Sequence, residues 1–241
     1  MRRALAAAAL VVLLTACNGG SGSGAEVTVF AASSLTEVFQ AIDPDARYNF
    51  AGSDELATQI REGGGADVFA AASPKYPGEL HDAGLVEKPQ TFATNKLVLI
   101  VPEDNPAGIQ SVHDLGKPGV KLVVGAEGVP IGDYTRSVLE NMGASNVLDN
   151  VVSQEEDVKG VVSKVSLGEA DAGFVYATDV KPVADKVAVI DLPEDAQARV
   201  EYQIAIVRES EHADAAQQFV DLVLGQDGQA ALRLAGFGPV P

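Results

Sequence analysis

The stretch Val27-Thr28-Val29-Phe30-Ala31-Ala32-Ser33-Ser34-Leu35-Thr36 decides the fold of this chain. Its first half alternates β-branched and aromatic residues, a pattern typical of a buried strand. Two small residues and two hydroxyls follow, and then apolar residues at helical spacing, which predicts that a helix begins there. The first N–H groups of a helix lack partners, and the helix dipole is positive at that end. The junction therefore predicts either an anion site or an ordinary loop in which Ser33 or Ser34 caps the helix.

The rest of the chain continues this order of strand and helix with short connections. Residues 96–101, Lys-Leu-Val-Leu-Ile-Val, form a continuous apolar run that favours a central parallel strand covered on both faces. Alternating strands and helices predict a doubly wound α/β fold. We expect strands at residues 27–32, 47–51, 67–72, 96–101, 121–125, 147–152, 171–176, 187–192 and 200–207, and helices at residues 35–42, 54–62, 75–83, 131–142, 157–167, 212–224 and 229–234.

The series of alternating elements occurs twice, which predicts two doubly wound lobes. The long strands near residues 95–102 and 199–207 would join them as a two-strand hinge. Such an arrangement leaves a cleft between the carboxyl ends of the strands, where ligands of α/β proteins bind. The expected first lobe comprises residues 26–98 and 203–241, and the expected second lobe comprises residues 99–202.

The N-terminus predicts export and lipidation. Arg2 and Arg3 precede a short apolar run ending in Leu14-Thr15-Ala16-Cys17, which is a secretory signal too short to span a membrane. Leu-x-Ala-Cys resembles the bacterial lipobox, in which the chain is cut before the cysteine and that cysteine is lipidated. We expect a signal peptide at residues 1–16, and a lipidated Cys17 with a flexible tether at residues 17–25. A plain cleaved signal is the alternative, although this only cysteine of the chain has no disulfide partner.

Composition excludes several classes of function. The formal charge of −17 argues against nucleic acid or an anionic membrane surface as a partner, since both require a basic face. The three histidines, His81, His113 and His212, have no metal-ligand spacing, and no Gly-x-Ser-x-Gly elbow is present. The carboxylates are scattered, so paired acid–base chemistry has no support. The sequence therefore predicts neither an enzyme nor a site for a metal ion.

Five junctions, the opening stretch among them, each leave donor groups at a helix start or a strand end. Each one alone fits a helix cap or a core residue. Ser34 precedes the first helix, Ser53 follows a strand in Gly52-Ser53, Ile131 stands in Gly128-Val129-Pro130-Ile131-Gly132, Val158 follows Glu155-Glu156-Asp157, and Tyr176 ends the apolar strand Gly173-Phe174-Val175-Tyr176.

Taken together, the motifs around these junctions resemble those of the periplasmic molybdate-binding proteins of ABC importers. The resemblance covers nearly all of the chain after the tether, with the motifs in the same order. The motifs are Val29-Phe30-Ala31-Ala32-Ser33-Ser34-Leu35-Thr36, Phe50-Ala51-Gly52-Ser53 with Leu56-Ala57-x-Gln59-Ile60, Ala66-Asp67-Val68-Phe69, Val129-Pro130-x-Gly132-x-Tyr134, Glu156-Asp157-Val158-Lys159-Gly160 and Phe174-Val175-Tyr176-x-x-Asp179.

The resemblance implies the type II periplasmic binding protein fold and a cleft for molybdate or tungstate, with no cofactor. It also implies five ligands of the oxyanion. These are the hydroxyls of Ser34, Ser53 and Tyr176 and the backbone N–H groups of Ile131 and Val158. They coordinate the oxyanion alone, so no direct ligand of a metal ion is expected. Ile131 is bulkier than the small residue common in the family, but its donor belongs to the main chain.

The resemblance further implies the partners and the location of the protein. We expect a monomer outside the cytoplasmic membrane, anchored through lipidated Cys17, that delivers its ligand to a membrane permease with a cytoplasmic ATPase. Two alternatives stay open. The cleft could take another small anion such as sulfate or phosphate, or the chain could be a secreted α/β enzyme acting on a phosphorylated or sulfated substrate. The stretch from Thr36 to Phe50 is several residues shorter than is usual in the family.

Overall fold

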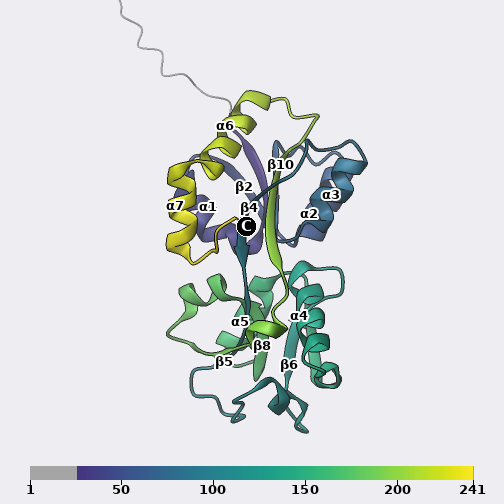
Figure 1. Ribbon diagram of the computed structural model, residues 1–241, viewed down its shortest axis with the longest axis vertical. Helices are drawn as coiled ribbons and strands as arrows, with labels where there is room; N and C mark the ends of the chain where they lie inside the picture. The colour runs from purple at the N-terminus through teal and green to yellow at the C-terminus, as the bar shows by residue number, and fades with distance from the viewer. Residues whose placement is uncertain (1–25, 241) are drawn as a thin grey trace, which may run out of the picture.

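A computed structural model describes residues 26–240, so the predictions for the signal peptide and for Cys17 lie outside the described residues. The chain forms two five-stranded sheets, each flanked by helices (Figure 1). The first sheet has the order β2-β1-β3-β10-β4 and the second β7-β6-β8-β5-β9. The strands are β1 Thr28–Ala32, β2 Arg47–Ala51, β3 Val68–Ala71, β4 Gln90–Asn95, β5 Leu97–Pro102, β6 Leu122–Gly125, β7 Val151–Glu155, β8 Ala172–Tyr176, β9 Val187–Asp191 and β10 Val200–Ile206. The predicted two-lobed α/β architecture is confirmed.

The helices cover both faces of each sheet. The α-helices are α1 Thr36–Ile42, α2 Ser53–Arg61, α3 Lys75–Asp82, α4 Pro130–Asn141, α5 Val158–Ser166, α6 Ala213–Leu224 and α7 Gln226–Ala235, and the 3-10 helices include η1 Ser33–Leu35, η3 Ser145–Asn150 and η4 Ala177–Val183. Successive side chains of β1 point to opposite faces of the first sheet, so each face carries its own core. Val29 and Ala31 face a core shared with α1, α6 and α7, whereas Phe30 faces a second core beneath α2 and α3.

The apolar strand β5 is fully buried, as the sequence predicts, but its direction differs from the prediction. It pairs antiparallel with both β8 and β9. The parallel assignment of residues 96–101 was therefore wrong. An apolar run reports burial on both faces, and burial alone does not fix the direction of the neighbouring strands.

The chain crosses between the lobes twice. It leaves the first sheet between β4 and β5 and returns between β9 and β10, so that two segments run side by side at the crossing (Figure 1). Gln197 links these segments through two hydrogen bonds. Its side-chain amide accepts from the Leu97 N–H at 3.0 Å and donates to the Leu97 carbonyl at 2.9 Å. The predicted two-strand connection is thus present, and the exact lobe boundaries stay a prediction.

Two strand assignments differ from those expected. Residues 145–150 form the 3-10 helix η3, and the strand predicted at 147–152 is β7, which begins at Val151. Strand β4 was not predicted, since Gln90–Asn95 has few apolar residues and lies at the edge of its sheet. Within residues 26–240, no helix is both long and apolar enough to cross a membrane.

Candidate functional site

Ser34 lies in the tight 3-10 turn η1, which follows β1 directly, and its side chain is 5% exposed. Its Oγ lies 2.9 Å from the hydroxyl of Tyr202 on β10. Tyr202 in turn accepts a long hydrogen bond from Asn95 Nδ2, at 3.5 Å. An amide nitrogen only donates, so Tyr202 accepts from Asn95, and either oxygen can be the donor in the bond between Ser34 and Tyr202. When Tyr202 donates in that bond, the Ser34 hydroxyl proton is free for a ligand.

The capping interpretation of this junction was wrong. Neither η1 nor the following helix α1 has a side-chain hydrogen bond at its N-cap. The Ser33 carbonyl instead accepts from Thr36 Oγ1 at 2.7 Å. The 3-10 turn shifts the start of α1 to Thr36, which places both serines before the helix rather than at its cap.

Ser53 is the first residue of α2 and is 1% exposed. Its Oγ accepts from the backbone N–H of Ala72 at 3.1 Å, at the carboxyl end of β3. That bond occupies a lone pair of the Ser53 oxygen and leaves the hydroxyl proton for a ligand. Neither Asp54 nor Glu55 caps this helix, because α2 has no side-chain hydrogen bond at its N-cap and Glu55 accepts from Gln59.

Ile131 is the second residue of α4, after Pro130 at the first position. An N–H there has no partner inside the helix. Gly132 lets this helix start approach the end of β6, since a Cβ at position 132 would collide with the Ala126 carbonyl oxygen. The Ile131 side chain packs against Gly125, so its bulk lies beside β6.

Val158 is the first residue of α5, and its N–H likewise has no partner inside the helix. Asp157 is the N-cap, and its side chain accepts from the Gly160 N–H at 2.9 Å. Asp157 therefore caps α5 from its N-terminal end. Its carboxylate satisfies the third N–H of α5 and leaves the first for another acceptor.

Tyr176 ends β8 and is 1% exposed, and its hydroxyl has no hydrogen-bond partner among residues 26–240. Burial raises the pKa of this phenol well above its usual value, and Tyr202 adds to the effect. The group therefore stays protonated at physiological pH and is a donor. An unpaired buried hydroxyl costs stability, so the Tyr176 hydroxyl is expected to have a partner that the described residues do not supply.

These five groups converge on one cavity between the lobes. The cavity measures about 20 Å³, far below the 300–1,000 Å³ typical of pockets for drug-sized molecules. Its lining comprises Ala32, Ser33, Ser34, Ala51, Gly52, Ser53, Ala72, Val129, Pro130, Ile131, Asp157, Val158 and Tyr176. The structure thus brings together all five residues that the sequence singled out. The cavity suits a small inorganic ion and not a sugar or a peptide.

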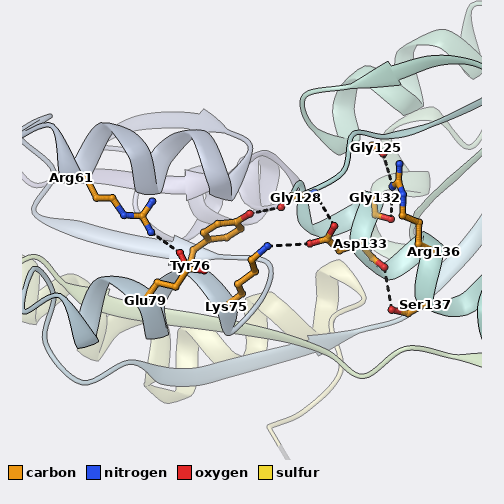
Figure 2. Close-up of polar contacts among 10 residues, drawn as sticks. All are labelled: Arg61, Lys75, Tyr76, Glu79, Gly125, Gly128, Gly132, Asp133, Arg136 and Ser137. Atoms are coloured by element: carbon orange, nitrogen blue, oxygen red, sulfur yellow. Dashed lines mark hydrogen bonds and ion pairs between the residues drawn. The ribbon is translucent and has the colours of Figure 1, made fainter.

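The lobes touch around this cavity, so the structure is a closed form. Figure 2 shows Tyr76 of the first lobe donating to the Gly128 carbonyl of the second, and Lys75 beside Asp133 at 3.5 Å. Asp133 also accepts from the Gly128 N–H at 2.8 Å, which fixes the loop that leads into α4. A Cβ at Gly52 would lie 2.5 Å from a backbone oxygen of the other lobe, so only glycine permits this approach.

The sequence analysis did not predict Tyr202, which contacts the Ser34 hydroxyl, or Asn95, which contacts Tyr202. Tyr202 and Asn95 lie 168 and 107 positions from the groups that they contact. The alternation of β10 marks Tyr202 as buried, but no sequence signal indicates that its hydroxyl meets Ser34. Among residues 26–240, no group of three or more His, Cys, Asp or Glu side chains could hold a metal ion.

Comparisons with known proteins agree with this geometry. Residues 27–238 match the family model described as bacterial extracellular solute-binding protein. The chain is 38% identical to the molybdate-binding protein ModA of Mycobacterium tuberculosis, over 97% of this chain and 95% of that protein. It is 31% identical to ModA of Escherichia coli, over 88% of each.

Among solved structures, the periplasmic molybdate-binding protein of Azotobacter vinelandii superposes with a TM-score of 0.78 at 22% identity, covering 90% of this chain and all of the other. This likeness confirms the predicted periplasmic binding protein fold. The resemblance carried by the six sequence motifs is confirmed as well. The chain belongs to the family of bacterial extracellular solute-binding proteins.

Proposed function

We propose that this protein is the substrate-binding component of an ABC importer and that it captures molybdate, or tungstate, in the cavity between its lobes. The observation that carries the proposal is the donor set. The five residues that carry these three hydroxyls and two helix-start N–H groups line one cavity of about 20 Å³, and they are Ser34, Ser53, Tyr176, Ile131 and Val158. Relatives over nearly the whole chain carry the name molybdate-binding protein.

Neutral donors suit a buried dianion. Burying a charge is costly unless hydrogen bonds replace its water, and each hydrogen bond to a charged group contributes roughly 1.5–3 kcal/mol. Ser53 is oriented for this role, since its hydroxyl accepts from the Ala72 N–H behind it, and the Ser34 hydroxyl can accept from Tyr202 in the same way. A donor-rich cavity disfavours hydrogen phosphate, whose own O–H needs an acceptor. Sulfate has the same charge as molybdate and is excluded by its smaller size.

An enzymatic role for these serines lacks support. The hydroxyl of Ser34 contacts Tyr202, and that of Ser53 contacts a backbone N–H. Neither contact supplies the general base that a nucleophilic serine requires. We therefore propose transport without catalysis, in which the oxyanion is cargo and not a cofactor.

The transport role implies a location and partners. We propose that Cys17 carries a lipid that anchors the protein outside the cytoplasmic membrane, and that a monomer delivers the anion to a permease with its ATPase. The closed lobes would present a defined shape to that permease. Support comes from the lipobox-like sequence before Cys17 and from the family membership.

Thermal-shift measurements test the ligand assignment. The protein without its first 17 residues is heated with molybdate, tungstate, sulfate or phosphate at equal concentration, and calorimetry follows for every anion that raises Tm. Molybdate and tungstate are expected to raise Tm strongly and the other two little. A rise with sulfate or phosphate alone would assign the cavity to that anion instead.

A further inference from the structure

Lys159 bridges the two lobes beside the anion cavity. It is the second residue of α5, directly after Val158. Its ammonium lies 2.9 Å from both carboxylate oxygens of Glu37, which is on α1 of the first lobe. The same ammonium lies 3.4 Å from Asp179, on η4 of the second lobe. One side chain thus joins three elements, and each of these follows or contains a proposed ligand of the anion.

Helix stability does not account for a lysine at this position. The first turn of a helix carries the positive end of its dipole, where a cation is unfavourable. The side chain is nevertheless held, with an exposed fraction of 28% and two acidic partners. We therefore attribute the lysine at this position to its contacts with Glu37 and Asp179, and not to the stability of α5.

Lys159 compensates the buried negative charge of Asp179. Its carboxylate is 1% exposed, and neither oxygen has a hydrogen bond among the described residues. Burial raises the pKa of Asp179 to about 7, and the Lys159 charge opposes that rise. A buried carboxylate in the turn after Tyr176 would repel an anion held by that tyrosine. Lys159 offsets this charge and at the same time reaches across to Glu37.

We propose that Lys159 is a positioning residue that couples closure of the lobes to capture of the anion, by tying Glu37 of one lobe to Asp179 of the other. The identity of the anion rests on the proposed function, but the bridge itself does not. The contact with Glu37 crosses the cleft, so it exists only when the lobes are closed. Its contribution therefore adds to the affinity and not to the stability of the open form.

A second lysine at the cleft provides a contrast. Lys75 lies 3.5 Å from Asp133, and these side chains are 48% and 38% exposed. Exposed pairs of this kind contribute little, because water and salt screen them. Lys159 makes shorter contacts to two oxygens and is less exposed. We expect the larger effect on closure from Lys159.

Titration with sodium molybdate, followed by calorimetry and by stopped-flow dissociation, tests the coupling. Glu37→Gln and Lys159→Gln should each weaken binding about threefold to tenfold, through faster dissociation, and the double variant should be no weaker than Lys159→Gln alone. Lys159→Arg should recover most of the affinity. The matched control is Glu79→Gln, which removes an ion pair of 2.6 Å with Arg61 inside the first lobe and should bind as the wild type does.

Two further measurements keep the outcomes distinct. The ligand-free Tm of Glu37→Gln should equal that of the wild type, whereas a merely structural role would lower it. Wild-type affinity in both glutamine variants, or equal losses in the Glu79→Gln control, would overturn the coupling. If the wild type bound no molybdate, the proposed function would fail on its own. The bridge would then be judged with whichever of tungstate, sulfate or phosphate raises Tm, and wild-type affinity of Lys159→Gln for that anion would refute it.

Discussion

The unpaired hydroxyl of Tyr176 leads to a prediction about two quantities, the affinity for the anion and the stability of the ligand-free fold. Tyr176→Phe removes one oxygen from a buried ring and leaves the ring in place. That oxygen has no hydrogen-bond partner among the described residues, so the ligand-free protein loses no bond. The anion, in contrast, loses one of its five proposed donors. The substitution should therefore weaken binding without weakening the fold.

The magnitudes follow from the state of the hydroxyl. A buried polar group without a partner costs about 1–3 kcal/mol, so its removal should leave the free energy of unfolding unchanged or raise it by up to that amount. A hydrogen bond to a charged acceptor contributes roughly 1.5–3 kcal/mol, which corresponds to a loss of affinity of about tenfold to a hundredfold. The phenol is protonated at physiological pH, because burial holds its pKa well above the usual value.

Tyr202→Phe is the matched control. Tyr202 is equally buried and its ring lies 5.8 Å from that of Tyr176, but its hydroxyl contacts Ser34 and Asn95. Its loss should lower the free energy of unfolding by about 1 kcal/mol. Urea unfolding of the ligand-free proteins and calorimetry with molybdate measure both quantities. The reasoning fails if Tyr176→Phe destabilises the ligand-free protein as much as Tyr202→Phe does, or if it binds molybdate as tightly as the wild type.

Three further predictions concern single side chains. Ser34→Ala and Ser53→Ala should each weaken molybdate binding about tenfold to a hundredfold by calorimetry, and wild-type affinity in both would reject the site. Asp179 has a pKa raised by burial from 3.8 to about 7, so the native state binds more protons than the unfolded state between these values and stability falls as pH rises. The stability of Asp179→Asn relative to the wild type, from urea unfolding, should therefore increase by up to roughly 4 kcal/mol from pH 4 to pH 7; a flat difference would contradict this. Cys17→Ser should release the protein from the membrane fraction into the soluble fraction, and unchanged fractionation would exclude the lipid anchor.

Local patterns were sufficient to predict most of the elements and the junctions at which the proposed donors lie. Val29 and Phe30 face opposite cores because a strand alternates, and that alternation is visible in the sequence. Pro130 marks the first turn of α4, which places the Ile131 N–H at an unsatisfied helix start. Ser53 and Val158 follow from the same logic. Helix starts after strands need only neighbours in the sequence, so these junctions could be singled out without a structure, whereas the role of each proposed donor came from the family resemblance.

Properties that depend on distant partners could not be predicted in this way. The direction of β5 is set by pairing with β8 and β9, and an apolar run is compatible with either direction. The partner of Ser34 is a tyrosine 168 positions away. Ser34 also loses its predicted capping role because residues 33–35 form a 3-10 turn, and residue propensities do not distinguish such a turn from the start of an α-helix. Lys159 looks like an ordinary surface lysine in the sequence. Only the folded chain shows that it faces two acidic groups from different lobes.

The charge of the chain limits what can close the lobes. With a formal charge of −17, the protein as a whole repels a dianion, although charges beyond about 8 Å are largely screened at physiological salt. Acidic side chains also face each other across the cleft, since Asp54 and Glu55 of one lobe share a cavity of about 480 Å³ with Glu127 and Glu156 of the other. General electrostatics therefore oppose closure.

Short-range hydrogen bonds have to supply the driving force for closure. In the proposed site, the first lobe provides Ser34 and Ser53 and the second provides Ile131, Val158 and Tyr176, so neither lobe alone would surround the anion. An anion held by one lobe would keep part of its hydration, and closure exchanges that water for the donors of the other lobe. The ligand itself then joins the lobes, and the bridge from Lys159 to Glu37 adds a smaller contribution of the same kind. If the proposed donors hold the anion, any partner that separates the lobes also removes about half of them, which would couple opening directly to release.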